Sequence, residues 1–340
     1  MLANGEEWRL KVLFIGGSGN ISSICSEAAL EAGIDLFLLN RGESTKLRCP
    51  EKYRRIRADI RNPSQAAKAL NGLDFDVVVD WVGFSPADIE MDIQLFRGRV
   101  KQFIFISTAS AYQKPLSYPV ITESTPLHNP YWEYSRKKIS CEMRLMDAYR
   151  EELFPVTIVR PSHTYNTLVP VAVGKSNYTI PWRMLNGKKI IVPGDGTSLW
   201  TVTHAEDFAK GFIGLLGNMH AIGHSFHITS DEILTWNQIY NTIGDALGVE
   251  ASLIHIPTDF ISRFGEDVRG TLLGDKAWSV IFDNSKIKSF VPQFKATIPF
   301  TEGIKKTLAW FDEDEKRKQI DVESDRLMDQ IVSAFEKVYR

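Results

Sequence analysis

The sequence predicts an α/β protein in which a doubly wound parallel sheet is followed by a smaller C-terminal lobe. In the first half of the chain, short apolar runs alternate with stretches of helical periodicity. The runs are apolar throughout, not at every second residue, which is typical of parallel strands covered on both faces. Beyond residue 165 the chain becomes rich in Pro, Gly and Asn, with shorter apolar runs, which indicates a second and smaller unit.

The expected elements follow in chain order. Strands are predicted at residues 11–15, 34–40, 53–59, 75–83, 102–110 and 154–162. Helices are predicted at residues 24–32, 64–72, 134–150, 207–216 and 236–247. The tail, residues 313–340, has the pattern of one charged amphipathic helix whose apolar side carries Ile320, Leu327, Ile331 and Phe335. Right-handed crossovers between the strands would place helices on both faces of the sheet.

Composition excludes several classes of function. The 340 residues carry 40 Lys+Arg and 42 Asp+Glu, a formal net charge of −2, which excludes broad electrostatic capture of nucleic acid. No stretch reaches the roughly 18 apolar residues that a membrane helix needs, and the first ten residues are too polar for a signal peptide. The three cysteines form no CxxC pair and the seven histidines show no metal-ligand spacing. We expect no metal site, reduced thiols and a cytoplasmic location.

A glycine-rich segment joins the first strand to the first helix. In GGSGNIS, residues 16–22, Gly16 allows a tight turn and Gly19 allows the backbone to approach a pyrophosphate. The helix that follows would offer free N–H groups and the positive end of its dipole to that anion. Some glycine turns of this kind bind nothing, but this position after the first strand predicts a dinucleotide-binding, Rossmann-type domain.

The end of the second strand bears on the choice of cofactor. Folds that prefer NAD usually place Asp or Glu there, whereas a nearby Arg accommodates the 2′-phosphate of NADP. This chain has Asn40 followed by Arg41. NADP is therefore favoured, NAD remains possible, and the alternative is a solvated arginine in an Asn-Arg-Gly turn.

Two further features indicate chemistry. Hydroxyl side chains, including Thr108 and Ser110, lie at the C-terminal end of the buried strand at 102–110, at the sheet edge where such folds bind ligands. Tyr134 and Lys138 are spaced to lie one helical turn apart on the same face. An ammonium beside a phenol lowers the phenol pKa from its ordinary value near 10, which would make Tyr134 usable as a general acid or base. Taken alone, such a pair is usually a surface contact.

Together these motifs resemble the extended short-chain dehydrogenase/reductase superfamily, the NAD(P)-dependent sugar epimerases and dehydratases. The matching stretches, in order between residues 11 and 312, are GGSGNIS, ADIRN, VVDWVG, ISTASAY, YSRKKISCE, VRPSHTY, GDGTSLWTVTHAED and FDNSKIK. The resemblance implies that Tyr134 is the catalytic acid/base, that Lys138 lowers its pKa and binds ribose, and that Thr108 orients the reacting oxygen.

The same resemblance implies which residues contact cofactor and substrate. The expected cofactor contacts are Gly16, Gly19, Asn20 and Ile21 at the pyrophosphate, Asn40 and Arg41 at the ribose, Asp59 and Ile60 at the adenine, Val82 and Gly83 along the cofactor, Lys138, and Pro161 and Ser162 at the nicotinamide. The expected substrate contacts are Ser85, Ala109, Ser110, His163 and Trp200.

The chain also departs from the family pattern. Ser22 replaces the third glycine of the loop, Thr108 replaces the more usual Ser, and Gln113 follows Tyr112 where Gly is common. His163 stands where several epimerases have Asn. Trp200 stands where many members have an arginine that grips the diphosphate of a nucleotide-sugar; Arg183 or Lys188 is a candidate to replace it.

These observations give an expected organisation and function. Residues 10–165 form the dinucleotide-binding domain with returning elements near 201–230, residues 166–200 and 231–312 form the substrate-binding lobe, and residues 313–340 form a C-terminal helix. The leading hypothesis is an NAD(P)-dependent sugar or nucleotide-sugar epimerase or dehydratase. The alternatives are a carbonyl reductase acting on a small non-nucleotide substrate, and a non-catalytic dinucleotide-sensing or RNA-associated protein. The resemblance also implies a homodimer paired through the helix at 134–150, with Ile139, Met143 and Met146 available for burial, and no membrane or nucleic-acid partner.

Overall fold

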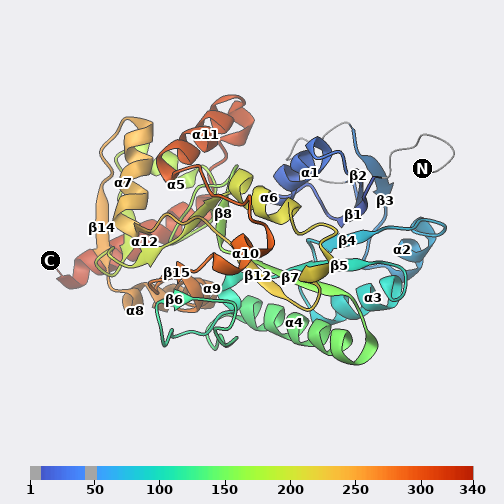
Figure 1. Cartoon of the computed structure of the whole chain (residues 1–340). Coiled ribbons are helices and arrows are strands. Elements are labelled where there is room, and N and C mark those ends of the chain that lie inside the picture. The colour runs from blue at the N-terminus through green and yellow to red at the C-terminus, as the bar shows by residue number, and fades with distance from the viewer. Residues whose placement is uncertain (1–8, 43–51, 340) are drawn as a thin grey trace.

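A seven-stranded parallel sheet organises the first two thirds of the chain (Figure 1). The computed structural model describes residues 9–42 and 52–339. The strand order is β12-β7-β5-β4-β1-β2-β3, so the chain reverses direction across the sheet between β1 and β4. The strands are β1 (Lys11–Ile15), β2 (Asp35–Asn40), β3 (Arg54–Arg57), β4 (Val77–Asp80), β5 (Gln102–Ile106), β7 (Val156–Pro161) and β12 (Ser225–Ile228). All six predicted strands are therefore in the sheet, and β12 from the returning segment adds the seventh.

Helices cover both faces of this sheet because alternate side chains of each strand point to opposite sides. Val12 and Phe14 of β1 pack with α1 (Ser22–Glu31) and α6 (Ala205–Ile213). Leu13 and Ile15 pack in the cluster formed with α3 (Pro86–Phe96) and α4 (Glu133–Glu152), beside which lies α2 (Pro63–Ala69). Figure 1 shows the two layers of helices, α1 and α6 on one side and α2, α3 and α4 on the other. The predicted doubly wound sheet is confirmed.

The C-terminal lobe has its own hydrophobic core. Trp236, Tyr240 and Ile243 of α7 (Trp236–Leu247) are completely buried in it, together with Ile190 of the β9 strand (Ile190–Pro193). The remaining helices are α5 (Thr179–Leu185), α8 (Thr258–Ile261), α9 (Glu266–Thr271), α10 (Ser285–Phe290), α11 (Phe300–Asp312) and α12 (Val322–Tyr339). Short two-stranded pairs complete it: β9 with β14 (Leu253–Ile256), β8 (His163–Tyr165) with β11 (Val202–His204), β10 (Leu199–Trp200) with β13 (Leu234–Thr235), and β6 (Val120–Ile121) with β15 (Ile281–Phe282).

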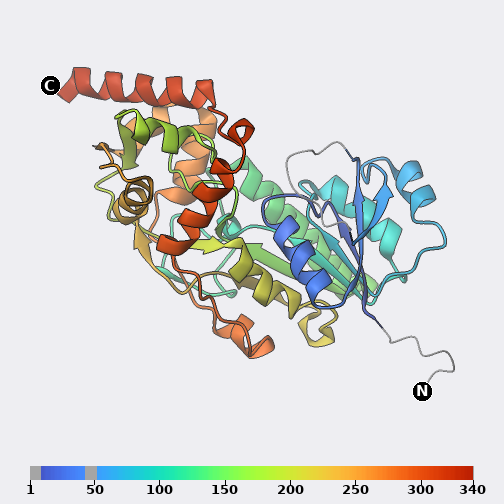
Figure 2. The ribbon, with the colours of Figure 1, turned by 90° about the horizontal axis from the view of Figure 1, so that it is seen from above.

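One predicted element is wrong in its extent. The tail is not a single helix from residue 313, because a 3-10 turn at Glu315–Arg317 is followed by a short non-helical stretch, and α12 begins only at Val322. The Asp321 carboxylate accepts a hydrogen bond from the Ser324 amide at 2.8 Å, as a helix-capping side chain does, so the helix starts there. Ile320 precedes the helix, while Leu327, Ile331 and Phe335 pack on the lobe core as expected. Figure 2 shows α12 running along the outer side of the lobe.

Two smaller findings bear on the sequence predictions. Cys25 and Cys141 are buried free thiols, and Cys49 lies outside the described residues. Across residues 9–42 and 52–339, no helix has the length and apolar content that crossing a bilayer requires.

Candidate active site

The glycine loop after β1 is shaped as a cradle that side chains would fill. Gly16 and Gly17 have φ angles of 102° and 89°, in the region that favours glycine. A Cβ atom on Gly17 would lie 2.6 Å from the Leu38 side chain. No side chain caps the N-terminus of α1, and no acidic residue stands in its first turn. Its orphan N–H groups and dipole therefore fit the pyrophosphate of a dinucleotide.

A cavity of about 350 Å³, here named the glycine-loop cavity, opens beside this loop. Its lining is Ile15, Gly16, Ser18, Leu39, Asn40, Arg41, Ala58, Asp59, Ile60, Arg61, Val82 and Phe84. Six of the predicted cofactor contacts are thus brought together. Arg57 and Arg61 were not predicted: Arg57 donates to the Arg41 carbonyl at 3.2 Å, and Arg61 lines the cavity.

Asn20 is engaged elsewhere through its side chain. Its amide donates to the Thr164 carbonyl at 2.9 Å and accepts from the Thr167 amide at 3.1 Å. The side chain therefore ties the glycine loop to β8 and to the segment that follows it, and only the backbone of Asn20 is left to face a pyrophosphate.

A second cavity of about 280 Å³, here named the tyrosine cavity, lies at the carboxyl ends of β5 and β7. Its lining is Thr108, Ala109, Ser110, Lys114, Trp132, Tyr134, Pro161, Ser162, His163, Trp200, Thr201, Asp275, Val280 and Phe282. Eight of the predicted site residues line it, including Thr108 and Tyr134. Ser85 does not: its hydroxyl accepts from the Asp88 amide and caps α3.

The environment of Tyr134 makes its phenol less acidic. Burial raises the pKa of Tyr134 to about 12, although a hydrogen bond with the Thr108 hydroxyl opposes that rise. Thr108 in turn lies 3.0 Å from the Ser110 hydroxyl, which lies 2.7 Å from that of Ser135. The prediction that the pKa of this phenol falls below its ordinary value is wrong for this structure, because desolvation outweighs the stabilising contact.

Lys138 is directed at backbone carbonyls. Its ammonium donates to the carbonyl oxygens of Gly83 and Ile106, each at 2.7 Å, and lies over the rings of Phe84 and Phe105. The side chain is 2% exposed. Lys138 therefore joins the segment that follows β4 to the end of β5.

Two buried carboxyl groups support this lysine, and sequence reasoning missed both. Asp80, at the end of β4, accepts from the amides of Val82 and Gly83 at 2.8 and 3.0 Å. It thereby fixes the turn whose Gly83 carbonyl receives the Lys138 ammonium. Burial and the neighbouring Asp80 raise the pKa of Asp92 well above its ordinary value, so Asp92 keeps its proton and shares it with Asp80. The signal for Asp80 was present in the sequence, since it is a carboxylate at the end of an otherwise apolar strand.

The wall of the tyrosine cavity opposite the sheet comes from the lobe. The indole of Trp200 stacks on Trp236 with ring centroids 5.6 Å apart and is 2% exposed. Burial, together with the charge of Lys276, lowers the pKa of His163 to about 3, so this imidazole is neutral. Lys114 and Asp275 add charged groups that were not predicted.

Asp275 belongs to a short π-helical segment, Leu272–Lys276, that continues α9. Asn129 donates from one amide to both the Ser110 carbonyl and the Gly274 carbonyl, at 2.8 and 2.7 Å, which holds this segment against the end of β5. A Cβ on Gly274 would lie 2.7 Å from that of Trp132, so the close approach depends on glycine. Helical periodicity carries no signal for a π turn, which is why Asp275 escaped prediction.

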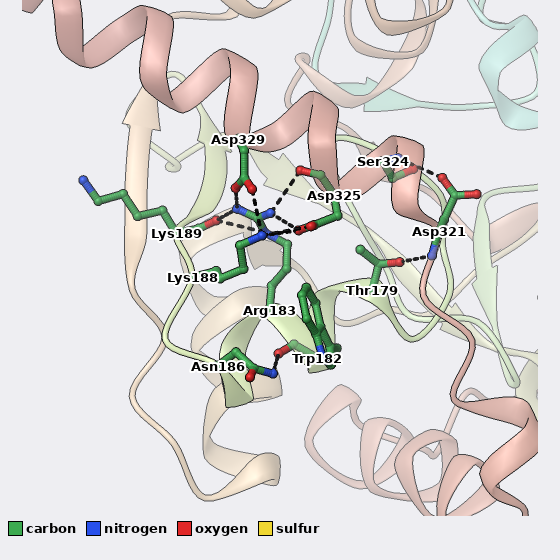
Figure 3. Close-up of polar contacts among 10 residues, drawn as sticks. All are labelled: Thr179, Trp182, Arg183, Asn186, Lys188, Lys189, Asp321, Ser324, Asp325 and Asp329. Atoms are coloured by element: carbon green, nitrogen blue, oxygen red, sulfur yellow. Dashed lines mark hydrogen bonds and ion pairs between the residues drawn. The ribbon is translucent and has the colours of Figure 1, made fainter.

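Neither residue proposed to replace the family arginine reaches this cavity. Figure 3 shows Arg183 and Lys188 directed at α12. The Arg183 guanidinium pairs with Asp325 and, at 2.9 Å, with Asp329, while Lys188 lies 2.8 and 2.7 Å from the same two carboxylates. Both cations therefore fasten α5 to the C-terminal helix.

Comparisons with known proteins agree with this geometry. The chain is 25% identical over 296 residues to 2'-dehydrokanamycin reductase of Streptomyces kanamyceticus, covering 86% of this chain and 82% of that protein. The fold matches the epimerase Mth375 of Methanothermobacter thermautotrophicus with a TM-score of 0.74 and 17% identity, over 91% of this chain and 94% of that one.

The fold also matches dTDP-glucose 4,6-dehydratase of Bacillus anthracis in complex with NAD. The TM-score is 0.71 and the identity 18%, over 90% of this chain and 98% of that one. The model of the NAD dependent epimerase/dehydratase family matches residues 12–229, which contain the glycine loop, Thr108, Tyr134 and Lys138. The chain belongs to the NAD dependent epimerase/dehydratase family.

Proposed function

We propose that this family enzyme interconverts a secondary alcohol and a ketone on a sugar or nucleotide-sugar, in an epimerase, dehydratase or reductase cycle, with Tyr134 as the acid/base. The observation that carries the proposal is the tyrosine cavity, where Thr108 and Tyr134 face Pro161 and Ser162. Such an arrangement places a hydrogen-bonded phenol next to the segment expected at the nicotinamide end of the cofactor.

The residues have distinct roles in this proposal. The glycine loop and the N-terminus of α1 hold the pyrophosphate, and residues of the glycine-loop cavity hold the adenosine. A bound nicotinamide supplies or accepts the hydride. Thr108 and Tyr134 hold the substrate oxygen, and the phenol, with its pKa of about 12, is protonated near neutral pH and ready to donate to a ketone oxygen.

A reductase acting on a small non-nucleotide ketone is the second candidate. Trp200 stands in place of the diphosphate-binding arginine, and Arg183 and Lys188 are held by α12. The relative from Streptomyces kanamyceticus is a reductase by name. The non-catalytic alternative is disfavoured, because a protein without turnover has no need to keep Thr108 and Tyr134 in one cavity.

The test uses two sets of reactants: keto-sugars and dTDP- or UDP-keto-sugars with NADPH or NADH, and sugars and dTDP- or UDP-sugars that carry the hydroxyl with NADP+ or NAD+. Nicotinamide absorbance is followed and the sugar products are identified. Net consumption of reduced cofactor identifies a reductase, and conversion of a sugar without net consumption identifies an epimerase or dehydratase. An absence of turnover with every sugar class, by a protein that binds the cofactor, would contradict the proposal.

We also propose that NADP is preferred over NAD. At the end of β2 stands Asn40, and not a carboxylate that would repel the 2′-phosphate of NADP. Arg41, Arg57 and Arg61 lie around this end of the strand. A charge-assisted contact contributes on the order of 1.5–3 kcal/mol, about tenfold or more in affinity. Calorimetry should show tighter NADP binding, and Arg41→Ala should remove most of the difference. Equal or tighter binding of NAD by the unmodified protein would exclude this preference.

A further inference from the structure

Three side chains stand four residues apart along α4: Tyr134, Lys138 and Glu142. This spacing places them on one side of the helix. Tyr134 lines the tyrosine cavity. Lys138 donates to the carbonyls of Gly83, after β4, and Ile106, at the end of β5. Glu142 continues the row and is 2% exposed. The side of α4 that carries the phenol therefore also carries a buried carboxylate.

The Glu142 carboxylate is bound from two neighbouring strands. Arg160 of β7 forms a bidentate pair with it, in which Nε lies 3.0 Å from Oε1 and Nη2 lies 2.6 Å from Oε2. The hydroxyl of Ser107, the residue that follows β5, donates to the same carboxylate. The Ser107 amide donates to the Val159 carbonyl at 2.7 Å, so β5 and β7 are still joined at this point. Glu142 thus fastens α4 to the ends of both strands.

These contacts lie one residue away from the tyrosine cavity. Thr108 follows Ser107, and Pro161 follows Arg160, and both line the cavity together with Tyr134. A shift of α4 against the two strand ends would therefore change the distance of the phenol from Thr108 and from the segment expected at the nicotinamide. Reacting groups that are misplaced by about 1 Å lose on the order of 10²-fold in rate.

Stability alone does not account for this buried pair. Arg160 and Glu142 are 5% and 2% exposed, and the cost of desolvating two charges offsets most of their attraction. Among the described residues, the buried Nη1 of Arg160 has no hydrogen-bond partner. Apolar side chains of similar volume often replace such a pair without loss of stability. What a bidentate pair does provide is a fixed orientation of both groups.

We propose that Glu142 and Arg160 are positioning residues, which hold Tyr134 at a fixed distance from Thr108 and from the nicotinamide end of the cofactor. In the part of the chain that the structure describes, neither side chain lines the tyrosine cavity or the glycine-loop cavity, so both act through the residues next to them. The inference rests on the proposed function, because it takes the segment at Pro161 as the place of the nicotinamide.

The experiment compares the binding of NADPH with that of 2′-phospho-ADP-ribose, which lacks the nicotinamide. Calorimetry gives both dissociation constants, and their ratio measures what the nicotinamide contributes. NADPH should bind about tenfold or more tightly to the unmodified protein. NADH and ADP-ribose are compared in the same way if NAD is the tighter cofactor.

The decisive variant carries Glu142→Met and Arg160→Met together. It leaves no unpaired charge in the interior, so its melting temperature should stay close to that of the unmodified protein. Most of the nicotinamide contribution should nevertheless be lost, while the affinity for 2′-phospho-ADP-ribose stays unchanged. With a sugar that the unmodified protein turns over, kcat should fall by about 10²-fold. Ser107→Ala removes one link without leaving a buried charge, and should lower the contribution and kcat by less.

Arg144→Met is the matched control. Arg144 also lies on α4, but it pairs with Glu90 of α3 at 2.8 Å and with Glu152 of α4 itself at 2.9 Å. This variant should lower the melting temperature while leaving the ratio of the two dissociation constants and kcat unchanged. A loss of stability in the docking of α4 is thereby separated from a loss of position.

A double variant that keeps the nicotinamide contribution of the unmodified protein would overturn the inference, because the pair would then have a structural role only. Equal affinity of the unmodified protein for the two ligands would overturn it as well. The binding measurement needs no turnover. A contribution that depends on the pair, in a protein that turns over no sugar, refutes the proposed function alone. Turnover by the double variant at the rate of the unmodified protein refutes this inference alone.

Discussion

At the scale of single residues, the environment of Tyr134 decides what the phenol can do. Tyr134→Phe removes one oxygen and keeps the ring packing on Trp132, whose centroid is 4.9 Å away. General acid–base catalysis typically contributes about 10²- to 10⁴-fold, so turnover should fall by that factor while cofactor affinity hardly changes. Steady-state kinetics with cofactor titrations would check both. A phenylalanine variant with full activity would refute the acid/base role.

Lys138→Met is the informative comparison. It leaves the Gly83 and Ile106 carbonyls without their ammonium donor and leaves Asp80 without its cation. We therefore expect this variant to lose cofactor affinity as well as turnover, in contrast to Tyr134→Phe. Loss of turnover alone would assign Lys138 to the proton relay rather than to the ends of β4 and β5.

The carboxyl pair of Asp80 and Asp92 predicts a pH dependence of stability. The folded-state pKa of Asp92 is raised above an unfolded value of about 3.9, so folding takes up a proton above that pH. This contribution to stability is complete below the unfolded pKa and declines as pH rises toward the folded one. Asp92→Asn keeps a donor for Asp80 without the titration. Its melting temperature should fall less than that of the unmodified protein between pH 5 and 8.

Asp74→Asn, an exposed carboxyl on the segment before β4, is the control and should leave the pH profile of the melting temperature unchanged. If the Asp92→Asn and unmodified profiles run parallel, the two buried carboxyl groups do not share a proton in the folded state.

At the scale of elements, the ion pairs of α5 with α12 fasten the C-terminal helix to the lobe. Arg183 is 1% exposed, and it donates to the Lys189 carbonyl at 2.8 Å as well as to its two aspartates. Removing one partner of a buried pair costs about 3–5 kcal/mol, and the half-exposed Asp329 reduces this for Arg183→Met to about 2–3 kcal/mol.

Urea denaturation would measure the loss, and limited proteolysis should show earlier cleavage near α12. Lys305→Met, which breaks an exposed pair with Glu302 on α11, is the control and should change neither measurement. If Arg183→Met were as stable as that control, α12 would be held by its apolar side alone.

The elements also show how far sequence reasoning reaches. Strands such as β1 and β5 were predictable because they are apolar throughout, and the glycine loop because its conformation requires glycine. The tail helix was predicted to begin too early, because hydrophobic periodicity does not reveal the helix cap at Asp321. Lys114 and Asp275 were missed because both line the tyrosine cavity only once the lobe has folded back toward the end of β5. The two residues are 161 positions apart, and no local pattern encodes that arrangement.

At the scale of the whole molecule, we predict a homodimer that pairs through α4. Met143 is 61% exposed on that helix, and the flanking Ile139 and Met146 are partly buried on the same side. Light scattering should give twice the chain mass of 38.5 kDa. Met143→Lys should shift the protein toward the monomer, since it places a charge in the apolar contact. Met219→Lys, at an exposed methionine far from α4 in sequence, should not. A monomer of the unmodified protein at micromolar concentration would exclude this pairing.

The π-helical segment Leu272–Lys276 makes the lining of the tyrosine cavity sensitive to chain length. A π turn holds one residue more than the α turn it replaces. Deleting one residue from the segment would let it relax into a regular helix, and because each residue advances such a helix by about 100°, Asp275 would turn away from the tyrosine cavity. A new specificity would then arise from the loss of a single codon, in one evolutionary step, with Tyr134 and the cofactor loop untouched.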